Sequence, residues 1–284
     1  MLFQTSTILA LLPALAAAIQ APNKESQGLK LVFEETFSGP AGASVNEDTW
    51  QIALNINSNN EHQVYTTSND NMQISGGGSF QIVPRRHADG SWTSGRIESR
   101  EAWSAPPGGV MQIEGSIRLG WNLQGSKQGI WPAFWTLGDA LRHGTGWPQC
   151  GEIDIMEQVS GAPTAYATVH CDVYPGGRCQ EPLGRQGTTS MSDDDWHTWA
   201  IKIDRTDGDW TRQVITWTKD GAEFHRLTGA MIGDQAIWGT LAHSPLYVLL
   251  NVAVGGNWPG APNAATLDGY GSMMEIQYVA VYTS

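Results

Sequence analysis

Residues 151–158 read Gly-Glu-Ile-Asp-Ile-Met-Glu-Gln, which places three carboxylates within a short, otherwise apolar, strand-like run. Alternate side chains of a strand share a face, so Glu152 and Asp154 point one way and the isoleucines beside them point the other way. The next acid comes one position late, at Glu157, because residue 156 is methionine. One extra residue in a strand is a β-bulge, which can re-aim a side chain beside an active site. We therefore expect a bulged strand that directs all three acids to one face.

Three crowded carboxylates repel one another, and their pKa values are driven apart. A protein tolerates this arrangement where it needs one carboxylate ionised and another protonated. Hydrolysis of a glycosidic bond needs such a pair: a proton donor at the leaving oxygen and a carboxylate at the anomeric carbon. The alternative is a row of surface acids on an edge strand. The isoleucines at 153 and 155 argue against it, because they predict that the opposite face is buried.

Two tryptophans in a second candidate strand point to the same chemistry. Trp131 and Trp135 are four residues apart, so in a strand they share a face. An indole offers a flat apolar face and a polar N–H edge, which suits the C–H face of a sugar ring. Burial of both side chains in the core is the alternative. Acids and indoles along one groove are what a sugar polymer would require.

The acidic segment resembles the signature of glycoside hydrolase family 16, Glu-x-Asp-x-x-Glu, in the bulged form typical of laminarinase-like members. Four further segments resemble strands of that family in the same order along the chain. They are residues 31–37, 131–135, 168–170 and 251–260. Together the resemblances extend over residues 30–283, nearly the whole expected mature chain.

The resemblance implies a role for each acid. Glu152 corresponds to the nucleophile and Glu157 to the general acid/base. Asp154 lies between them and is expected to hydrogen-bond Glu152 and tune its pKa. The same resemblance implies residues that contact the sugar, and these are Asn60, Arg96, Trp131, Trp135, His170 and Trp258.

Several of these residues have plainer interpretations. Arg96, Glu98 and Arg100 have the same parity, so they could form a structural ion-pair ladder instead of a sugar contact. A lone histidine such as His170 is usually structural, and no second histidine lies at ligand spacing for a metal. Trp103 is either a further sugar contact or a core residue.

Composition limits the class of protein. The 284 residues carry a formal net charge of −12, with a pI of about 4.9, which argues against a nucleic-acid partner. Charged residues make up only 15%, while there are 33 glycines and 13 tryptophans. This composition favours many short strands and turns over long amphipathic helices. A chain of this length suits one large β domain with a self-supporting core.

Short apolar runs recur between turn clusters from residue 31 onward. Examples are residues 72–75, 80–83, 110–119, 165–169, 199–203, 214–217, 246–252 and 274–282. A short helix is expected around residues 231–238. The pattern predicts an all-β fold, a two-sheet antiparallel sandwich. The resemblance sharpens this to a concanavalin-like jelly roll with a cleft across its concave sheet.

The first residues predict secretion. Met1–Ala18 contains an apolar run that ends in small residues, as a secretory signal peptide does, and it is too short to span a bilayer. We expect residues 19–284 to form a single catalytic domain that is extracellular, monomeric and without a membrane partner. Secretion permits a disulfide. A Cys171–Cys179 pair could close a short turn and leave Cys150 free, although the sequence alone allows three pairings.

No cofactor is needed for this chemistry, and no catalytic metal is expected. Many members of the family carry an Asp in the final strand as part of a calcium site. Here the corresponding residue is Gln277, and a neutral amide is a poorer calcium ligand than a carboxylate.

These observations predict a secreted, retaining endo-β-glucanase that hydrolyses β-1,3-glucan, with mixed β-1,3/1,4-glucan as a further substrate. A cell-wall transglycosylase is the rival within the enzyme class, because a sugar could accept the same glycosyl-enzyme. A non-catalytic glucan-binding lectin is the rival from another class. A lectin needs the aromatic groove but not three acids within it.

Overall fold

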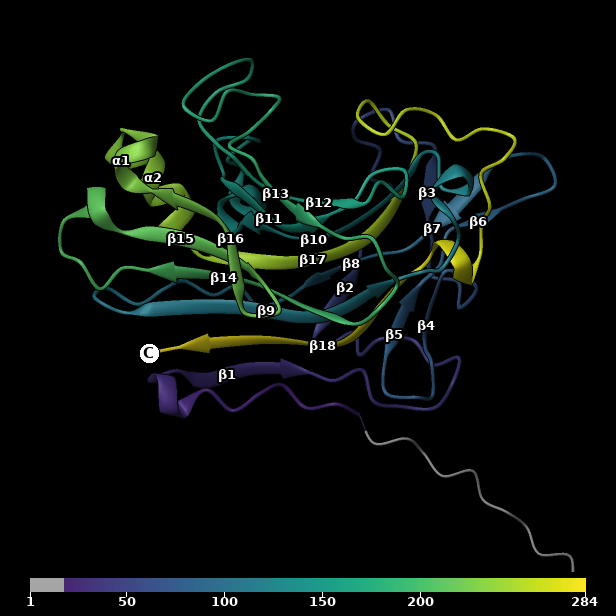
Figure 1. Ribbon diagram of the computed structural model, residues 1–284, viewed down its shortest axis with the longest axis horizontal. Coiled ribbons are helices and arrows are strands. Elements are labelled where there is room, and N and C mark those ends of the chain that lie inside the picture. The colour runs from purple at the N-terminus through teal and green to yellow at the C-terminus, as the bar shows by residue number, and fades with distance from the viewer. Residues whose placement is uncertain (1–17) are drawn as a thin grey trace, which may run out of the picture.

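The computed structural model describes residues 18–284, and its backbone forms two stacked antiparallel sheets (Figure 1). The first sheet has the order β16-β15-β14-β9-β18-β5-β4, and β1 also pairs with β18. Its strands are β1 (Lys30–Glu35), β4 (Met72–Ile74), β5 (Phe80–Ile82), β9 (Val110–Leu119), β14 (His197–Asp204), β15 (Val214–Lys219), β16 (Ala222–Thr228) and β18 (Met274–Thr283). The predicted signal peptide lies outside the described residues, apart from Ala18.

The second sheet has the order β13-β12-β11-β10-β17-β8-β2. Its strands are β2 (Trp50–Ile52), β8 (Arg96–Ser99), β10 (Ile130–Gly138), β11 (Glu152–Glu157), β12 (Thr164–His170), β13 (Gly187–Ser190) and β17 (Leu246–Val254). A small third sheet contains β3 (Gln63–Tyr65), β6 (Arg85–Arg86) and β7 (Trp92–Ser94). The expected all-β sandwich is confirmed, as are the eight strands predicted from apolar runs.

Helices are few and short. The expected helix around residues 231–238 is two helices, α1 (Gly229–Ile232) and α2 (Gln235–Ala242). They separate because Gly233 adopts a left-handed conformation and the Asp234 side chain caps the second helix. The described residues also contain short 3₁₀ helices, which are η1 (Glu25–Gln27), η2 (Gln124–Ser126), η3 (Asp139–His143), η4 (Trp210–Arg212) and η5 (Tyr270–Ser272). Among residues 18–284, no helix combines the length and apolarity that crossing a bilayer requires.

The core lies between the two large sheets, where one face of each strand is buried. In β14, Trp199, Ile201 and Ile203 alternate into it, as the period of two predicts. In β18 the buried positions change from even to odd numbers because the register shifts between Ile276 and Tyr278. Gly115 in β9 lets the sheets approach, since a Cβ there would lie 3.1 Å from the Phe134 ring of the facing sheet.

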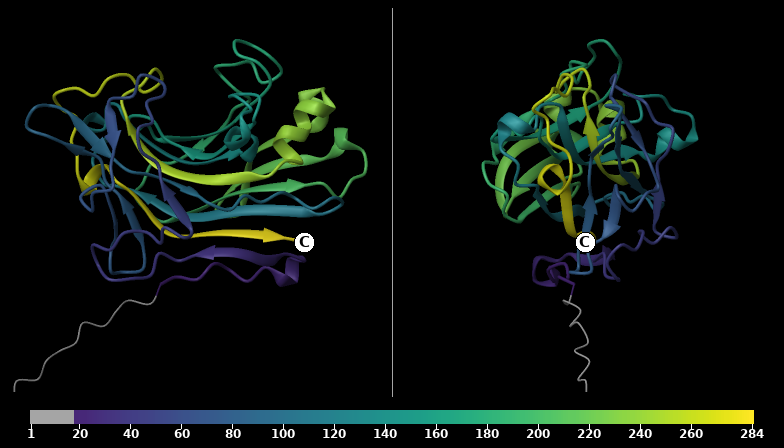
Figure 2. Two further views of the ribbon diagram at one scale, coloured as in Figure 1. Left: turned by 180° about the vertical axis from the view of Figure 1, so that it is seen from behind. Right: turned by 90° about the vertical axis from the view of Figure 1, so that its right-hand side faces the viewer.

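The second sheet is curved, and loops rise at both ends of its outer face (Figure 1). The teal-green segment between β12 and β13 rises at one end, and the yellow segment after β17 rises at the other. Figure 2 shows β1 and β18 side by side at the opposite surface, in agreement with their pairing. The outer face of the second sheet is therefore the surface that loops border.

Candidate active site

A β-bulge lies in β11, as the spacing of its acids predicts. Asp154 pairs with Trp135 of β10, whereas the next paired residue, Met156, is opposite Phe134, so Ile155 has no partner. On the other side, the register with β12 also shifts between Asp154 and Glu157. Both Ile155 and Met156 are buried in the core. The bulge therefore returns Glu157 to the outer face that Glu152 and Asp154 occupy.

The facing sheet contacts this bulge directly. Trp217 of β15 is fully buried, and its indole N–H donates a 2.8 Å hydrogen bond to the backbone carbonyl of Asp154. A bulge interrupts the ladder locally, so a buried carbonyl beside it needs another donor. Trp217 supplies that donor across the core.

Each catalytic candidate has a distinct set of neighbours. The indole N–H of Trp147 donates to Glu152 at 3.0 Å, and that of Trp131 donates to Glu157 at 2.9 Å. Asp154 is 3% exposed, and its Oδ2 is a buried oxygen without a hydrogen-bond partner among the described residues. The three acids therefore share a face but not an environment.

Burial raises the pKa of all three acids, and neighbours separate them. For Glu152, the charge of His170 and the hydrogen bond from Trp147 oppose the rise. For Asp154, the charges of Glu157 and Glu152 add to burial, so its pKa lies well above the ordinary value. Burial raises the pKa of Glu157 to about 7, against the lowering effect of the Trp131 bond. A pKa of about 7 makes Glu157 a proton donor near neutral pH, and the His170 charge and the Trp147 bond favour the ionised form of Glu152.

His170 lies directly opposite Glu152 in the β11–β12 ladder. Its Nε2 is 3.6 Å from Asp154 Oδ2 and 4.0 Å from Glu152 Oε1, and its Nδ1 is 2.7 Å from Glu181 Oε2. Burial lowers the pKa of His170, but the bond to Glu181 and the nearby carboxylates outweigh burial and raise that pKa to about 9. A cationic imidazole thus faces Glu152 and Asp154.

Three tryptophans lie on the same surface. Trp131 and Trp135 are both partly exposed, which agrees with the expected shared face of β10. Trp258 is 41% exposed and packs edge-on against Trp131 at 5.6 Å and near Tyr166 at 4.9 Å between ring centroids. An aromatic surface therefore extends from Glu157 to the loop after β17.

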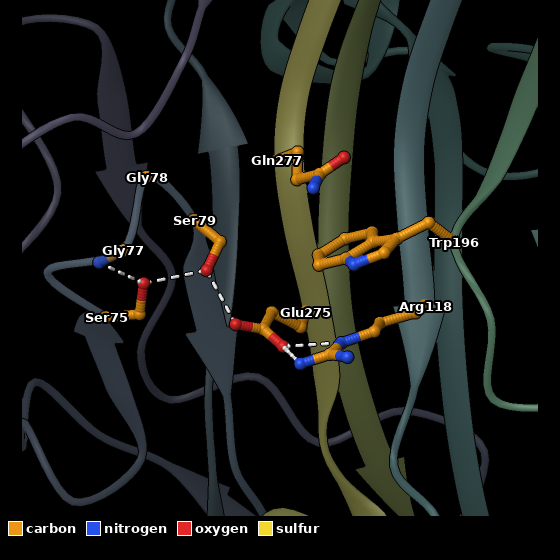
Figure 3. Close-up of a pocket in the computed structure, with 8 residues that line it drawn as sticks. All are labelled: Ser75, Gly77, Gly78, Ser79, Arg118, Trp196, Glu275 and Gln277. Carbon is orange, nitrogen blue, oxygen red and sulfur yellow. Dashed lines mark hydrogen bonds and ion pairs between the residues drawn. The ribbon is translucent and has the colours of Figure 1, made fainter. Parts of the chain in front are cut away.

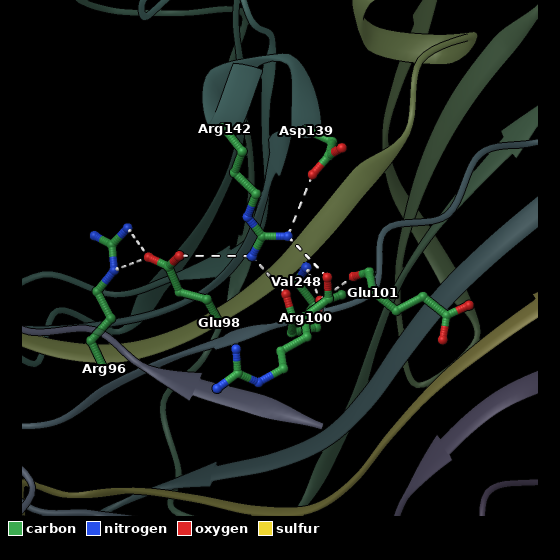
Figure 4. A network of polar contacts seen from close by, with 8 residues as sticks. Arg96, Glu98, Arg100, Glu101, Asp139, Arg142 and Val248 are labelled. Carbon is green, nitrogen blue, oxygen red and sulfur yellow. Dashed lines mark hydrogen bonds and ion pairs between the residues drawn. The ribbon is translucent and has the colours of Figure 1, made fainter. Parts of the chain in front are cut away.

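Arg96 forms the first part of the expected structural ion-pair ladder and also stacks on a tryptophan of the proposed sugar surface. Its guanidinium lies 4.9 Å from the Trp135 ring centroid, and it forms a buried ion pair with Glu98 at 2.8 Å. The ladder does not continue to Arg100, whose Nε donates to the backbone of Glu47. Arg142 takes that place instead, at 3.9 Å from Glu98 (Figure 4).

Asn60 does not reach the acids. Its amide donates a 2.7 Å hydrogen bond to Asn257, and the backbone N–H of Asn257 bonds Asn59. It therefore joins its own loop to the loop that carries Trp258. Trp103 is 7% exposed and packs against Phe33 of β1, so it is a core residue and not a sugar contact.

Two functional candidates carried no recognisable sequence signal. Trp147 and Glu181 belong to loops, and only the fold brings them to Glu152 and His170. The nearest signal for Glu181 was its position two residues after Cys179. The disulfide joins Cys171 and Cys179, and Cys150 is buried and free. This is the one of the three possible pairings that closes a short turn.

Glu152, Asp154 and His170 also place one ligand atom each within 4.8 Å of one another, as some metal sites do. His170 Nδ1 is committed to Glu181, and the raised pKa leaves Nε2 protonated at neutral pH. A protonated nitrogen has no lone pair for a metal. The arrangement favours hydrogen bonding over metal ligation.

The residue at the family's calcium position, Gln277, lines a pocket of about 380 Å³ on the outer face of the first sheet (Figure 3). Its amide oxygen accepts a 2.8 Å bond from Ser116. The neighbouring carboxylate, Glu275, is already paired with Arg118 at 2.7 Å and bonded to Ser79. A guanidinium and a committed carboxylate do not fit a calcium ion, which needs several free oxygen ligands.

Comparisons with known proteins agree with this geometry. Residues 90–231 match the family model described as an XgeA-like, catalytic GH16 domain. A β-glucanase from Rhodothermus marinus is 30% identical over 241 residues, which cover 79% of this chain and 74% of that protein. Glucan endo-1,3-β-glucosidase A1 from Niallia circulans is 26% identical over 90% of this chain, although the match spans only 38% of that longer protein.

Solved structures give the same result. The endo-1,3-β-glucanase from Streptomyces sioyaensis superposes with a TM-score of 0.86 at 34% identity, covering 93% of this chain and 98% of that one. The laminarinase from Rhodothermus marinus superposes with a TM-score of 0.71 at 26% identity, covering 89% and 97% of the two chains.

Proposed function

The chain belongs to glycoside hydrolase family 16, and on that basis we propose that it is a secreted, retaining endo-β-1,3-glucanase with Glu152 as nucleophile and Glu157 as acid/base. The observation that carries the proposal is the bulge in β11. It aims two glutamates at one surface, where Glu152 accepts a hydrogen bond from Trp147 and Glu157 accepts one from Trp131.

The chemistry follows from these two environments. Glu157, protonated at and below about pH 7, gives its proton to the leaving oxygen while Glu152 attacks the anomeric carbon. The bond to the leaving sugar breaks and a glycosyl-enzyme forms. Glu157, now ionised, takes a proton from water, which displaces Glu152 with net retention. His170 lies beside Glu152, and its positive charge favours the ionised form of that glutamate. The expected hydrogen bond from Asp154 to Glu152 is absent among the described residues, where Asp154 Oδ2 has no hydrogen-bond partner.

The substrate class is inferred from the relatives and the aromatic surface. The two solved relatives are a laminarinase and an endo-1,3-β-glucanase, and this chain covers nearly their whole length. Trp131, Trp135 and Trp258 offer indole surface next to the acids, where glucose rings could stack. β-1,3-Glucan is therefore the main substrate, and mixed β-1,3/1,4-glucan is a second one.

Digestion of a polysaccharide panel tests this proposal. Purified protein is incubated with laminarin, lichenan, xyloglucan and agarose, and product sizes are followed over time. We expect rapid shortening of laminarin with a spread of oligosaccharides, as endo cleavage gives. Products longer than the starting oligosaccharide would indicate transfer to sugar, and binding without new reducing ends would indicate a lectin.

Azide rescue tests the roles of the glutamates with an activated aryl β-glucoside. In Glu152→Ala, azide occupies the place of the nucleophile, and the expected product is an α-glycosyl azide. In Glu157→Ala, azide attacks the glycosyl-enzyme, and the expected product is a β-glycosyl azide. The opposite anomers would reverse the assignment.

Secretion is tested separately by expressing the full chain in a eukaryotic host. We expect activity in the medium and an N-terminus near residue 19. Retention of uncleaved protein inside the cells would contradict this part of the proposal.

A further inference from the structure

Glu181 is a buried acid that the reaction does not use directly. Its side chain is fully buried, although it follows β12 in a loop that rises from the sheet. A buried carboxylate is costly unless it is paired and hydrogen-bonded. One of its oxygens accepts from His170 Nδ1 at 2.7 Å, and the other accepts from the backbone N–H of Cys171 at 3.0 Å.

The loop around Glu181 is fixed at several points. Its backbone pairs with Gly176, and the Cys171–Cys179 disulfide joins the loop to the end of β12. The loop then packs on the histidine ring, since a Cβ at Gly184 would lie 2.9 Å from His170 Cε1. Glu181 is therefore held in a set position relative to the imidazole.

We propose that Glu181 is a positioning residue: by accepting the Nδ1 proton of His170 it holds the imidazole as a cation whose Nε2–H faces Glu152 and Asp154, and so keeps Glu152 ionised. The inference rests on the proposed role of Glu152 as nucleophile. It also gives a function in the reaction to the loop that the disulfide joins to the end of β12.

Charge around the imidazole supports this assignment. Glu152, Asp154 and Glu157 approach it from β11, and Glu181 approaches it from the loop. Arg96 of β8 is a weaker positive influence on Glu152 than His170 is. Asp154 Oδ2, without a hydrogen-bond partner among the described residues, lies 3.6 Å from His170 Nε2. The imidazolium is thus the main cation beside the nucleophile.

Glu181→Gln tests the proposal with little change of shape. The single amide oxygen of the new side chain can still accept the hydrogen bond from the Cys171 backbone N–H. The amide NH₂ group then faces His170 Nδ1, and this nitrogen can accept a hydrogen bond from it only after losing its own proton. We expect the His170 pKa to fall toward its ordinary range, measured by NMR titration of its ring protons. The acidic limb of kcat/KM should move up by about one pH unit, because a nearby cation no longer favours ionised Glu152. We expect kcat to fall about 10- to 100-fold, by analogy with other oriented histidines.

Asp220→Asn is a matched control. Asp220 also accepts from a histidine Nδ1, that of His197 at 2.7 Å, and from the backbone N–H of Thr198 at 2.8 Å, but it lies in the turn between β15 and β16 of the first sheet. The Asp220→Asn substitution should leave the pH profile of kcat/KM unchanged. In a His170→Asn background, Glu181→Gln should have no further effect on kcat, because Glu181 acts through that ring.

The inference would be overturned if Glu181→Gln left the pH profile of kcat/KM unchanged. It would also be overturned if Glu181→Gln lowered kcat equally in the wild-type and His170→Asn backgrounds. If the variant does not fold, titration of the wild type decides, since an ordinary His170 pKa there contradicts the cationic ring. If the wild type cleaves no glucan, the proposed function fails, whereas the His170 titration still reports on Glu181.

Discussion

At the scale of residues, the site depends on unequal protonation of similar groups. Glu152 and Glu157 lie on one strand and each accepts a hydrogen bond from a tryptophan indole, while the cationic imidazole of His170 lies 4.0 Å from Glu152. Burial raises both pKa values, and these neighbours oppose the rise. Substitutions that preserve shape but remove charge therefore test the roles most directly.

We expect Glu152→Gln and Glu157→Gln each to lower kcat on laminarin by about 10³-fold or more, since each removes a group that takes part in bond making or proton transfer. Asp154→Asn should leave a low residual rate, because it acts on Glu152 and not on the substrate. Initial rates of reducing-end release measure this. Near wild-type rates in either glutamate variant would refute the assignment.

The raised pKa of Glu157 predicts that activity and stability both fall as pH rises. Its pKa in the folded protein is about 7, above the ordinary 4.5, so kcat/KM should fall as pH rises through about 7. The folded state binds more protons than the unfolded state between these values, so stability should decrease across pH 4.5–7. Between pH 4.5 and 7, the free energy of unfolding in urea should decrease by about 1–3 kcal/mol less in Glu157→Gln than in the wild type. An equal pH slope in the two proteins would exclude a raised pKa.

At the scale of elements, the bulge in β11 is the device that brings the acids together. A one-residue shift sends a side chain to the opposite face, so Glu157 in a regular strand would point into the core. The register shifts against both β10 and β12, and Trp217 satisfies the carbonyl at the start of the bulge. The orientation of Glu157 therefore depends on Trp217 of the first sheet.

Trp217→Phe should destabilise the protein by about 1–3 kcal/mol beyond the cost of the smaller ring, because it leaves the Asp154 carbonyl unsatisfied. We also expect a lower kcat, measured alongside urea unfolding. Trp199→Phe is the control, since Trp199 is equally buried in the neighbouring strand but its indole N–H has no partner among the described residues. Equal effects of the two substitutions on kcat would mean that the carbonyl bond does not hold the bulge.

At the scale of the whole molecule, the two outer faces differ in character. The second sheet presents acids, indoles and a buried ion pair between Arg96 and Glu98, bordered by loops. The first sheet presents the pocket around Gln277, and the one carboxylate among the described residues that line this pocket, that of Glu275, is bound to Arg118. The acids and indoles of the proposed reaction therefore lie on one face, whereas the Glu275 carboxylate in the pocket of the other face is committed to Arg118 and Ser79.

We expect removal of calcium by a chelator to leave the Tm unchanged, and millimolar calcium to leave it unchanged as well, because the donors around Gln277 are committed. Differential scanning calorimetry in both conditions measures this. A rise in Tm that depends on calcium concentration would show a binding site and contradict the prediction.

Much of the fold could be predicted because its pattern is local. Period-two apolar runs placed the strands, and the late acid at 157 predicted the bulge, since both depend only on which residues alternate. Trp131 and Trp135 were assigned to one face for the same reason. The helix near residue 235 was placed but not divided, because a cap depends on the geometry of one side chain, Asp234.

The chemical groups of this site and the strand that carries them can be read from the amino-acid order: three acids, their spacing and their common face. What surrounds those acids depends on the three-dimensional fold. Trp147 and Glu181 reach the site from loops, Arg142 replaces Arg100 beside Glu98, and Trp217 reaches Asp154 across the core. These contacts join residues far apart in the chain or in loops without a periodic pattern, and a pKa depends on distance and burial, which no local pattern records.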